Sequence, residues 1–116
     1  MTLQEFYDAI GGDYKGVMSR LMKEERVVKY VRKFLNDASF ETLNAKLDEG
    51  DYEEAFRAAH TIKGVASNLG FSRLLDSSHQ LTEELRGGSA PASTDNLERV
   101  RADYKQTIEA IQALEG

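Results

Sequence analysis

A histidine and a lysine one helical turn apart are the residues of this sequence best suited to carry chemistry. They lie in the alanine-rich stretch AFRAAHTIKGVASNLGF, residues 55–71, as His60 and Lys63, and Gly64 follows directly. Imidazole is a nucleophile near neutral pH, and a cation three residues further along a helix lies close enough to neutralise an anion on the ring. Glycine inside a helix costs about 1 kcal/mol relative to alanine. Its position beside the histidine therefore needs a reason other than helix stability.

Helical periodicity places this histidine on the face opposite the predicted core. With His60 at zero and about 100° per residue, the apolar side chains fall within about 60° of the opposite direction. These side chains are Ala55, Ala58, Ile62, Val65, Ala66 and Leu69. Around His60, with Arg57 nearer the edge of the face, lie Phe56, Lys63, Gly64 and Ser67. We therefore predict an exposed imidazole with one cation beside it and room for the backbone of a partner.

Helix start and stop signals divide the chain into several amphipathic segments. Capping residues followed three positions later by glutamate mark three helix starts, and glycines mark helix ends. The starts are Thr2 with Glu5, Asp51 with Glu54, and Asp95 with Glu98. Asp13 caps another segment, as does Asp37 or Ser39. The stops are Gly11-Gly12 and Gly50, and Gly70 either ends or kinks the helix that Asp51 starts. Apolar residues recur at helical spacing between these signals, as in Val27, Val28, Val31, Phe34 and Leu35.

No segment shows sustained two-residue alternation, so we predict no strand. Amphipathic helices with short connections favour an all-α fold, an antiparallel up-down four-helix bundle with additional short N-terminal helices. The length of 116 residues suits one domain, 1–116. We expect the bundle core to cover roughly 24–115 and residues 1–22 to form an N-terminal helical cover. The stretch GGSAPAS, 87–93, is predicted to be a loop.

Composition narrows the possible functions. The formal net charge of −5 argues against nucleic acid as the main partner. The cluster formed by Lys23, Arg26, Lys29, Arg32 and Lys33 is interleaved with acidic residues, which favours a solvated helix face over an anion site. No apolar run is long enough to span a membrane, the N-terminus lacks the pattern of a signal peptide, and there is no cysteine. A cytoplasmic protein is expected.

The sequence lacks the motifs of an autonomous catalyst. It has no glycine-rich phosphate loop and no serine-nucleophile motif, and its two histidines, 19 residues apart, do not make a zinc site. Phosphoryl transfer normally needs positioning by a bound metal, which partners would have to supply. His60 is thus predicted to hold a phosphoryl group without activating one. His79, off the main apolar stripe, is interpreted as a boundary residue, with a role in tuning His60 as the alternative.

The stretch HTIKGVASNLG, 60–70, resembles the signature of the histidine-containing phosphotransfer (HPt) domain of phosphorelays. The flanking segments LDEGDYEEAFRAA and FSRLLDSSHQLTEEL are similar to those of the same family, so the resemblance covers about 27–86. It implies a four-helix bundle whose exposed histidine exchanges phosphoryl groups with aspartates of response-regulator receiver domains. It also implies that a sensor histidine kinase, which can be a hybrid kinase, acts in the same pathway.

Carried over by position, the resemblance makes His60 the phosphorylated residue. Lys63 would support the phosphate, and Gly64 would clear space for the receiver. Thr82 falls where some family members hold a glutamine that bonds the ring, so it is a candidate for orienting the imidazole. Val65 stands where the family usually has a small residue, and its place at the edge of the core offers a packing reason. Phe56, Arg57 and Ser67 are predicted to contact the partner.

The sequence thus predicts a phosphoryl carrier with no turnover of its own. No cofactor is expected on this chain, and Mg²⁺ is expected only on the partner receiver domain. The protein is expected to be a monomer that binds neither nucleic acid nor membrane. The Met1 start and the complete caps favour a free-standing protein over an excised domain. The alternative function is a helical interaction module that docks receiver domains without being phosphorylated; a metal-dependent enzyme has the least support.

Overall fold

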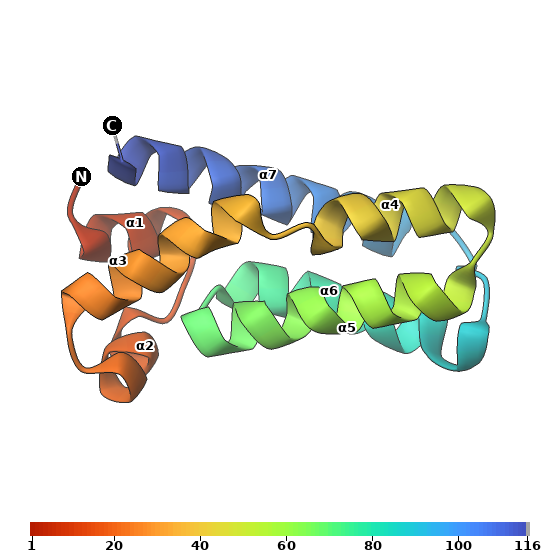
Figure 1. The fold of residues 1–116 in the computed structure, drawn as a ribbon, viewed down its shortest axis with the longest axis horizontal. Helices are drawn as coiled ribbons and strands as arrows, with labels where there is room; N and C mark the ends of the chain where they lie inside the picture. Colours follow the sequence, from red (N-terminus) through yellow and green to blue (C-terminus); the bar gives the residue numbers. More distant parts are fainter. Residues whose placement is uncertain (116) are drawn as a thin grey trace.

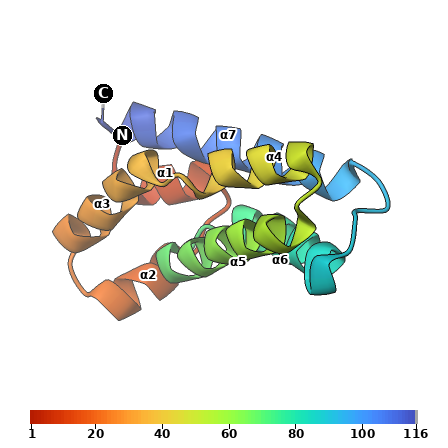
Figure 2. The ribbon, with the colours of Figure 1, turned by 45° about the vertical axis from the view of Figure 1, so that its right-hand side comes forward.

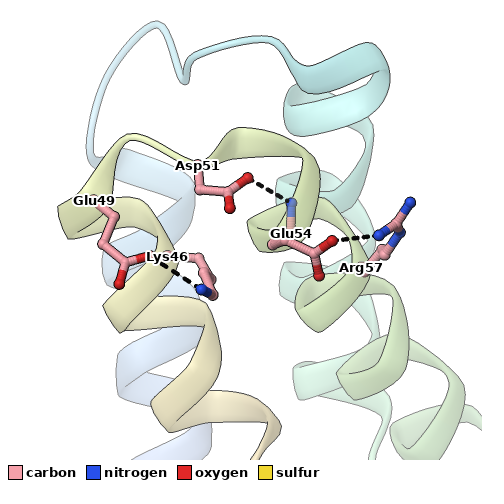
Figure 3. A network of polar contacts seen from close by, with 5 residues as sticks. All are labelled: Lys46, Glu49, Asp51, Glu54 and Arg57. Atoms are coloured by element: carbon pink, nitrogen blue, oxygen red, sulfur yellow. Dashed lines mark hydrogen bonds and ion pairs between the residues drawn. The ribbon is translucent and has the colours of Figure 1, made fainter.

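The helix that carries the histidine begins and ends where the sequence predicts. In the computed structural model, which describes residues 1–115, α5 spans Tyr52–Leu69. The Asp51 side chain accepts a hydrogen bond from Glu54 N at 3.2 Å, and Gly70 ends the helix in a left-handed conformation with φ 72°. The capping box predicted at this start is only half formed, because the Glu54 carboxylate pairs with Arg57 (Figure 3).

Residues 1–115 form seven α-helices and two short 3₁₀-helices and contain no strand, which confirms the all-α prediction. In chain order they are α1 (Leu3–Ala9), α2 (Tyr14–Leu21), α3 (Glu24–Lys33), η1 (Phe34–Asn36), α4 (Ser39–Glu49), α5, α6 (Ser72–Leu85), η2 (Arg86–Gly88) and α7 (Asp95–Glu115). None of the helices in this part of the chain combines the length and apolar character needed to cross a bilayer.

The long helices make a four-helix bundle in which α3 and α4 act as one interrupted rod. They follow each other end to end, and α5, α6 and α7 run beside them, with α1 and α2 at the end that holds both termini (Figures 1 and 2). The described chain measures 40 × 25 × 21 Å along its principal axes. Because α5 packs against both α4 and α6, one face of α5 is left for solvent.

The interruption between α3 and α4 corrects one detail of the predicted core. Leu35 was assigned to the apolar stripe, but 37% of its surface is exposed. The backbone tightens into η1 at Phe34, and a 3₁₀-helix repeats every three residues, so Val31 and Phe34 face inward while Leu35 turns out. The following helix starts with Asp37 Oδ1 accepting from Ser39 N at 2.8 Å, so Asp37 is the residue that satisfies the helix start.

The start of α7 differs by one position from the prediction. The helix begins at Asp95 itself, and Glu98 N donates to the Thr94 carbonyl at 2.9 Å, so Asp95 lies inside the first turn. Two contacts tie this helix to α4. The rings of Phe40 and Tyr104 stack with centroids 4.0 Å apart, and Arg101 donates two hydrogen bonds to Asn44 Oδ1.

The first helix supplies part of the core. Phe6 and Tyr7 of α1, and Ile10 directly after it, are all almost fully buried. The Phe6 ring meets the ring of Phe71, at the turn between α5 and α6, with centroids 6.0 Å apart, and Phe34 meets Phe71 at 5.4 Å. Edge-to-face aromatic pairs of this kind therefore close the bundle at the end where α5 finishes.

The N-terminal segment also binds the end of α5. The last carbonyls of a helix have no partner inside the helix and must be satisfied from elsewhere. Here the donors come from the first 20 residues: Arg20 Nη2 to Ser67 O (3.1 Å) and Asn68 O (2.9 Å), Tyr7 OH to Leu69 O (2.6 Å), and Asp13 N to Gly70 O (2.8 Å). Burial raises the pKa of Tyr7, as expected for a phenol held neutral inside the protein.

Candidate functional site

His60 lies on the solvent face of α5, as the periodicity predicts. Its side chain is exposed, whereas Ala58, Ala59 and Ile62 are buried. Ala59 was not among the predicted core residues. It is buried because α6 packs along that flank of α5, the most extensive helix contact of the described chain. The imidazole is therefore presented to solvent by a helix that is anchored on both sides.

Lys63 and Gly64 share a shallow hollow with His60. The hollow has a volume of about 270 Å³ and is also lined by Ser67, Asn68 and Leu75. Lys63 is half-buried and makes no ion pair with any carboxylate in residues 1–115, so its charge stays available beside the ring. Ser67, predicted to contact the partner, is exposed.

Gly64 is open to solvent in the interior of α5. A methyl group placed on its Cα would meet no other atom within 4 Å. The monomer therefore has no packing reason for a glycine at this position, although glycine weakens a helix interior. What the glycine provides is an unobstructed approach to the imidazole along the outer face of the helix.

A second hollow lies on the other side of the histidine. It has a volume of about 550 Å³ and is lined by Phe56, Arg57, His60, Thr61 and Arg86. The ring of Phe56 lies with its centroid 6.1 Å from that of His60. Phe56 is half-buried and packs partly against the core, so it is less exposed than the sequence suggested.

Arg86 is a residue of this surface that the sequence reasoning missed. Its guanidinium lies 5.2 Å from the centre of the Phe56 ring. A signal was present, because α5 and α6 are antiparallel about the turn at Gly70 and Phe71. Counting equally in both directions from that turn pairs position 56 with 85, next to Arg86.

The two arginines near His60 are paired with carboxylates, unlike Lys63. Arg57 is exposed and forms an ion pair with Glu54 one turn earlier (Figure 3). Arg86 donates to both carboxylate oxygens of Glu83, at 3.0 and 2.7 Å. Hydrogen bonding from Arg86 lowers the pKa of Glu83, and the charges of His79 and Lys63 act in the same direction.

The structure does not bring Thr82 to the imidazole. Its side chain is fully buried, and its hydroxyl donates to the Ser78 carbonyl at 2.6 Å. A threonine in a helix commonly bonds the carbonyl four residues back, and position 82 faces the bundle interior. The suggested ring-orienting bond is therefore not formed in the described chain. His79 is half-buried at the boundary of α6, near Glu83, in keeping with a boundary position.

A helical bundle that presents a histidine on the open face of a central helix, with one uncommitted lysine beside it, defines the class of histidine phosphotransfer modules. The Hpt domain family model matches residues 29–114, and the chain belongs to this family. The resemblance noted in the sequence is thereby confirmed. Hpt domains are phosphocarrier modules of two-component signalling, which work with kinases and receiver domains and are not enzymes with turnover.

Among curated proteins, the chain is similar to the chemotaxis protein CheA of Halobacterium salinarum. The two are 33% identical over 69 residues, which are 57% of this chain and 10% of that protein. The chain thus corresponds to about a tenth of the length of the relative it matches. No solved structure matches the chain with significance. Within residues 1–115, no group of three or more histidine, cysteine, aspartate or glutamate side chains could hold a metal ion.

Proposed function

We propose that His60 is the phosphoryl-carrying residue of this Hpt domain. It accepts the group from an aspartyl phosphate of a receiver domain and passes it to an aspartate of another receiver. The observation that supports this role is the exposed imidazole beside the unpaired Lys63 and the open Gly64. The other histidine, His79, is half-buried on α6 and has no such clearance.

The transfer is a displacement at phosphorus. A nitrogen of the neutral imidazole attacks, an N–P bond forms, and the bond from phosphorus to the aspartate oxygen breaks, so the electron pair leaves with the carboxylate. The phosphorylated ring then loses the proton on its other nitrogen to solvent. We expect the distal nitrogen, Nε2, to be the nucleophile because it projects furthest from the helix. The reverse steps deliver the group to the next receiver.

The neighbours of His60 have separate parts in this proposal. Lys63 stabilises the charge that develops on the phosphoryl oxygens, and Gly64 lets the receiver bring its aspartate within bonding distance. Mg²⁺ is held by the receiver, because phosphoryl transfer depends on metal positioning. A sensor kinase charges the first receiver. The cytoplasmic location and the monomeric state expected from the sequence stay predictions.

The decisive experiment follows labelled phosphate from a receiver charged with acetyl phosphate and Mg²⁺. Wild-type protein should acquire an acid-labile, alkali-stable label, as expected for a phosphoramidate bond. His60→Gln should acquire none, and its free energy of unfolding should change by about 0.5 kcal/mol or less because the side chain is exposed. His79→Gln is the matched control and should label like wild type.

Two results would contradict the proposal. Label that persists on His60→Gln would move the phosphorylated residue elsewhere. A wild-type protein that binds the receiver but never acquires label would instead identify a docking module that is not phosphorylated, which is the alternative the sequence left open.

A further inference from the structure

A groove at the end of the bundle has no part in the site described so far. Its lining residues come from α2, from α3 with the 3₁₀-turn after it, and from the C-terminal end of α5. Figure 2 shows α2 beside that end of α5. Its volume is about 410 Å³. The apolar lining comes from Leu21, Phe34, Val65 and Leu69, and the exposed side chains of Arg20 and Lys33 border it. We call this feature the end groove.

Two exposed apolar side chains belong to the elements that form the end groove. Tyr30, 41% exposed, lines the groove itself, and Met22, 74% exposed, directly follows Leu21, which also lines it. Clustered exposed apolar groups of this kind are typical of surfaces that contact another molecule.

Met22 is unusual in its backbone as well as in its exposure. With φ 69° it is the one non-glycine residue of the described chain in the left-handed region. It ends α2, at a position where glycine is the usual residue because a side chain there is unfavourable. Fold stability therefore gives no reason for a methionine here, and neither does burial. A contact between the exposed Met22 side chain and a partner gives such a reason.

The end groove and the phosphotransfer site form one continuous surface. Asn68 lines both the end groove and the hollow around His60 and Gly64. On a helix of 3.6 residues per turn, Gly64 lies about 40° from His60, Asn68 about 80° and Val65 about 140°, all in the same direction. His60 and Asn68 are about 12 Å apart along the axis. A contact surface of ordinary size, about 800 Å² on each partner, covers both.

The charge around the groove indicates the chemistry of the partner. Of the charged residues that line the groove, Arg20 and Lys33 are basic and Asp37 is acidic. The segment 20–33 has six basic and two acidic residues, although Arg32 in it is paired with Glu115. Lys33 has no carboxylate partner within residues 1–115, and its Nζ lies 5.2 Å from the centre of the Tyr30 ring. The partner surface that complements this groove is an apolar ridge flanked by carboxylates.

We propose that the end groove, with Met22 and Tyr30, is the docking site that selects which receiver domain exchanges phosphoryl groups with His60. This inference rests on the proposed function, because the occupant is the same receiver. The Hpt family match begins at residue 29, so Arg20, Leu21 and Met22 lie outside it. The docking site therefore combines residues outside the matched region with Tyr30 and Lys33, which lie inside it.

The test compares receiver-driven with receiver-independent phosphorylation. Met22→Gly removes the exposed side chain and suits the left-handed backbone, so its melting temperature should equal or exceed that of wild type. Lys33→Glu reverses the charge beside the groove. Lys105→Glu makes the same change of charge on α7, away from the groove. Phosphoramidate, a small donor that needs no docking, probes His60 itself.

Both groove variants should raise the KM for the phosphorylated receiver at least fivefold and change kcat less than twofold. Their labelling by phosphoramidate should match wild type, as should every property of Lys105→Glu. The effect of Lys33→Glu should shrink at high salt. Unchanged KM values in both variants would overturn the docking inference alone. Failure of the wild type to acquire label from any charged receiver would overturn the proposed function and the docking inference together, even if phosphoramidate labels His60.

Discussion

Two glycines of the same helical region, Gly64 and Gly70, stand in opposite environments. A methyl group on Gly64 would meet nothing within 4 Å, whereas one on Gly70 would lie 2.8 Å from the Asp13 carbonyl oxygen. Gly64 has helical geometry inside α5, and Gly70 has φ 72° just after it. The first glycine weakens the isolated fold slightly, and the second is required by it.

The difference separates the interior of α5, at Gly64, from its C-terminal end, at Gly70. Around Gly64 the helix is bare, so a partner can reach His60. Around Gly70 the end of the helix is covered by the N-terminal segment, which donates hydrogen bonds to the carbonyls of residues 67–70. The histidine is thus exposed on a helix whose C-terminal end is held firmly, and substitutions at the two glycines should affect different properties.

The largest effect is expected for Gly70→Ala. The left-handed backbone and the contact with the Asp13 carbonyl together should lower the free energy of unfolding by about 2–4 kcal/mol. Gly50→Ala is the matched control, because Gly50 also ends a helix with positive φ but has open space around it. It should lose only about 1 kcal/mol in urea unfolding. Equal losses in the two variants would show that the N-terminal segment does not press on Gly70.

Tyr7→Phe tests the same end of the helix through one hydrogen bond. The Leu69 carbonyl would lose its buried donor, which should cost about 1–3 kcal/mol of stability at neutral pH. Tyr52→Phe is the control, because the Tyr52 hydroxyl makes no hydrogen bond within residues 1–115, and it should change stability by less than about 0.5 kcal/mol.

Tyr7 should also make the fold sensitive to alkaline pH. Burial raises its pKa in the folded state, so its contribution is complete below about pH 10, where an unfolded tyrosine ionises, and is lost as pH rises further. Urea unfolding between pH 9 and 11.5 should therefore show a shallower decline for Tyr7→Phe than for wild type. Some decline should remain, since burial also raises the pKa of Tyr104. If the free energy of unfolding fell equally steeply with pH in the two proteins, Tyr7 would not be a source of the alkaline sensitivity.

Gly64→Gln should change function in the direction opposite to stability. Glutamine is a good helix former and meets open space, so the melting temperature should be at least that of wild type. The side chain would obstruct the approach to His60, and a displacement of about 1 Å can slow a positioned reaction 100-fold. We expect transfer from a receiver to fall at least tenfold. Gly64→Ala, with a single methyl group, should stabilise by about 0.5–1 kcal/mol. A destabilised Gly64→Gln would assign the glycine to internal packing.

The smallest effect is expected for Lys63→Ala. One partly exposed cation near a developing charge should supply on the order of 1 kcal/mol, because solvent screens it. Transfer should slow about fivefold at low salt while His60 still acquires label. Arg57→Ala should slow transfer less, since Arg57 is already paired with Glu54. Similar rates for Lys63→Ala and wild type would remove Lys63 from the site.

Much of this site could be predicted because it lies on one helix. The bounds of α5, its solvent face and the open position of Gly64 follow from capping residues and the 3.6-residue period, which act over a few positions. Residues on α6 and on η2, which follows it, were harder to place. Thr82 was suggested for the imidazole and is instead buried against its own helix, while Arg86 was missed.

By itself, the sequence determined the all-α class, most helix boundaries and the presentation of His60 beside Lys63, since local backbone preferences and the spacing of apolar residues decide all three. Tertiary structure alone decided that the first 20 residues bind the end of α5, that Arg86 faces Phe56, and that α2 and α3 form a groove continuous with the histidine surface. These features depend on which faces of distant helices meet. That choice is made by the packing of the whole core, in which Phe6, Phe34 and Phe71 come together from three separate parts of the chain.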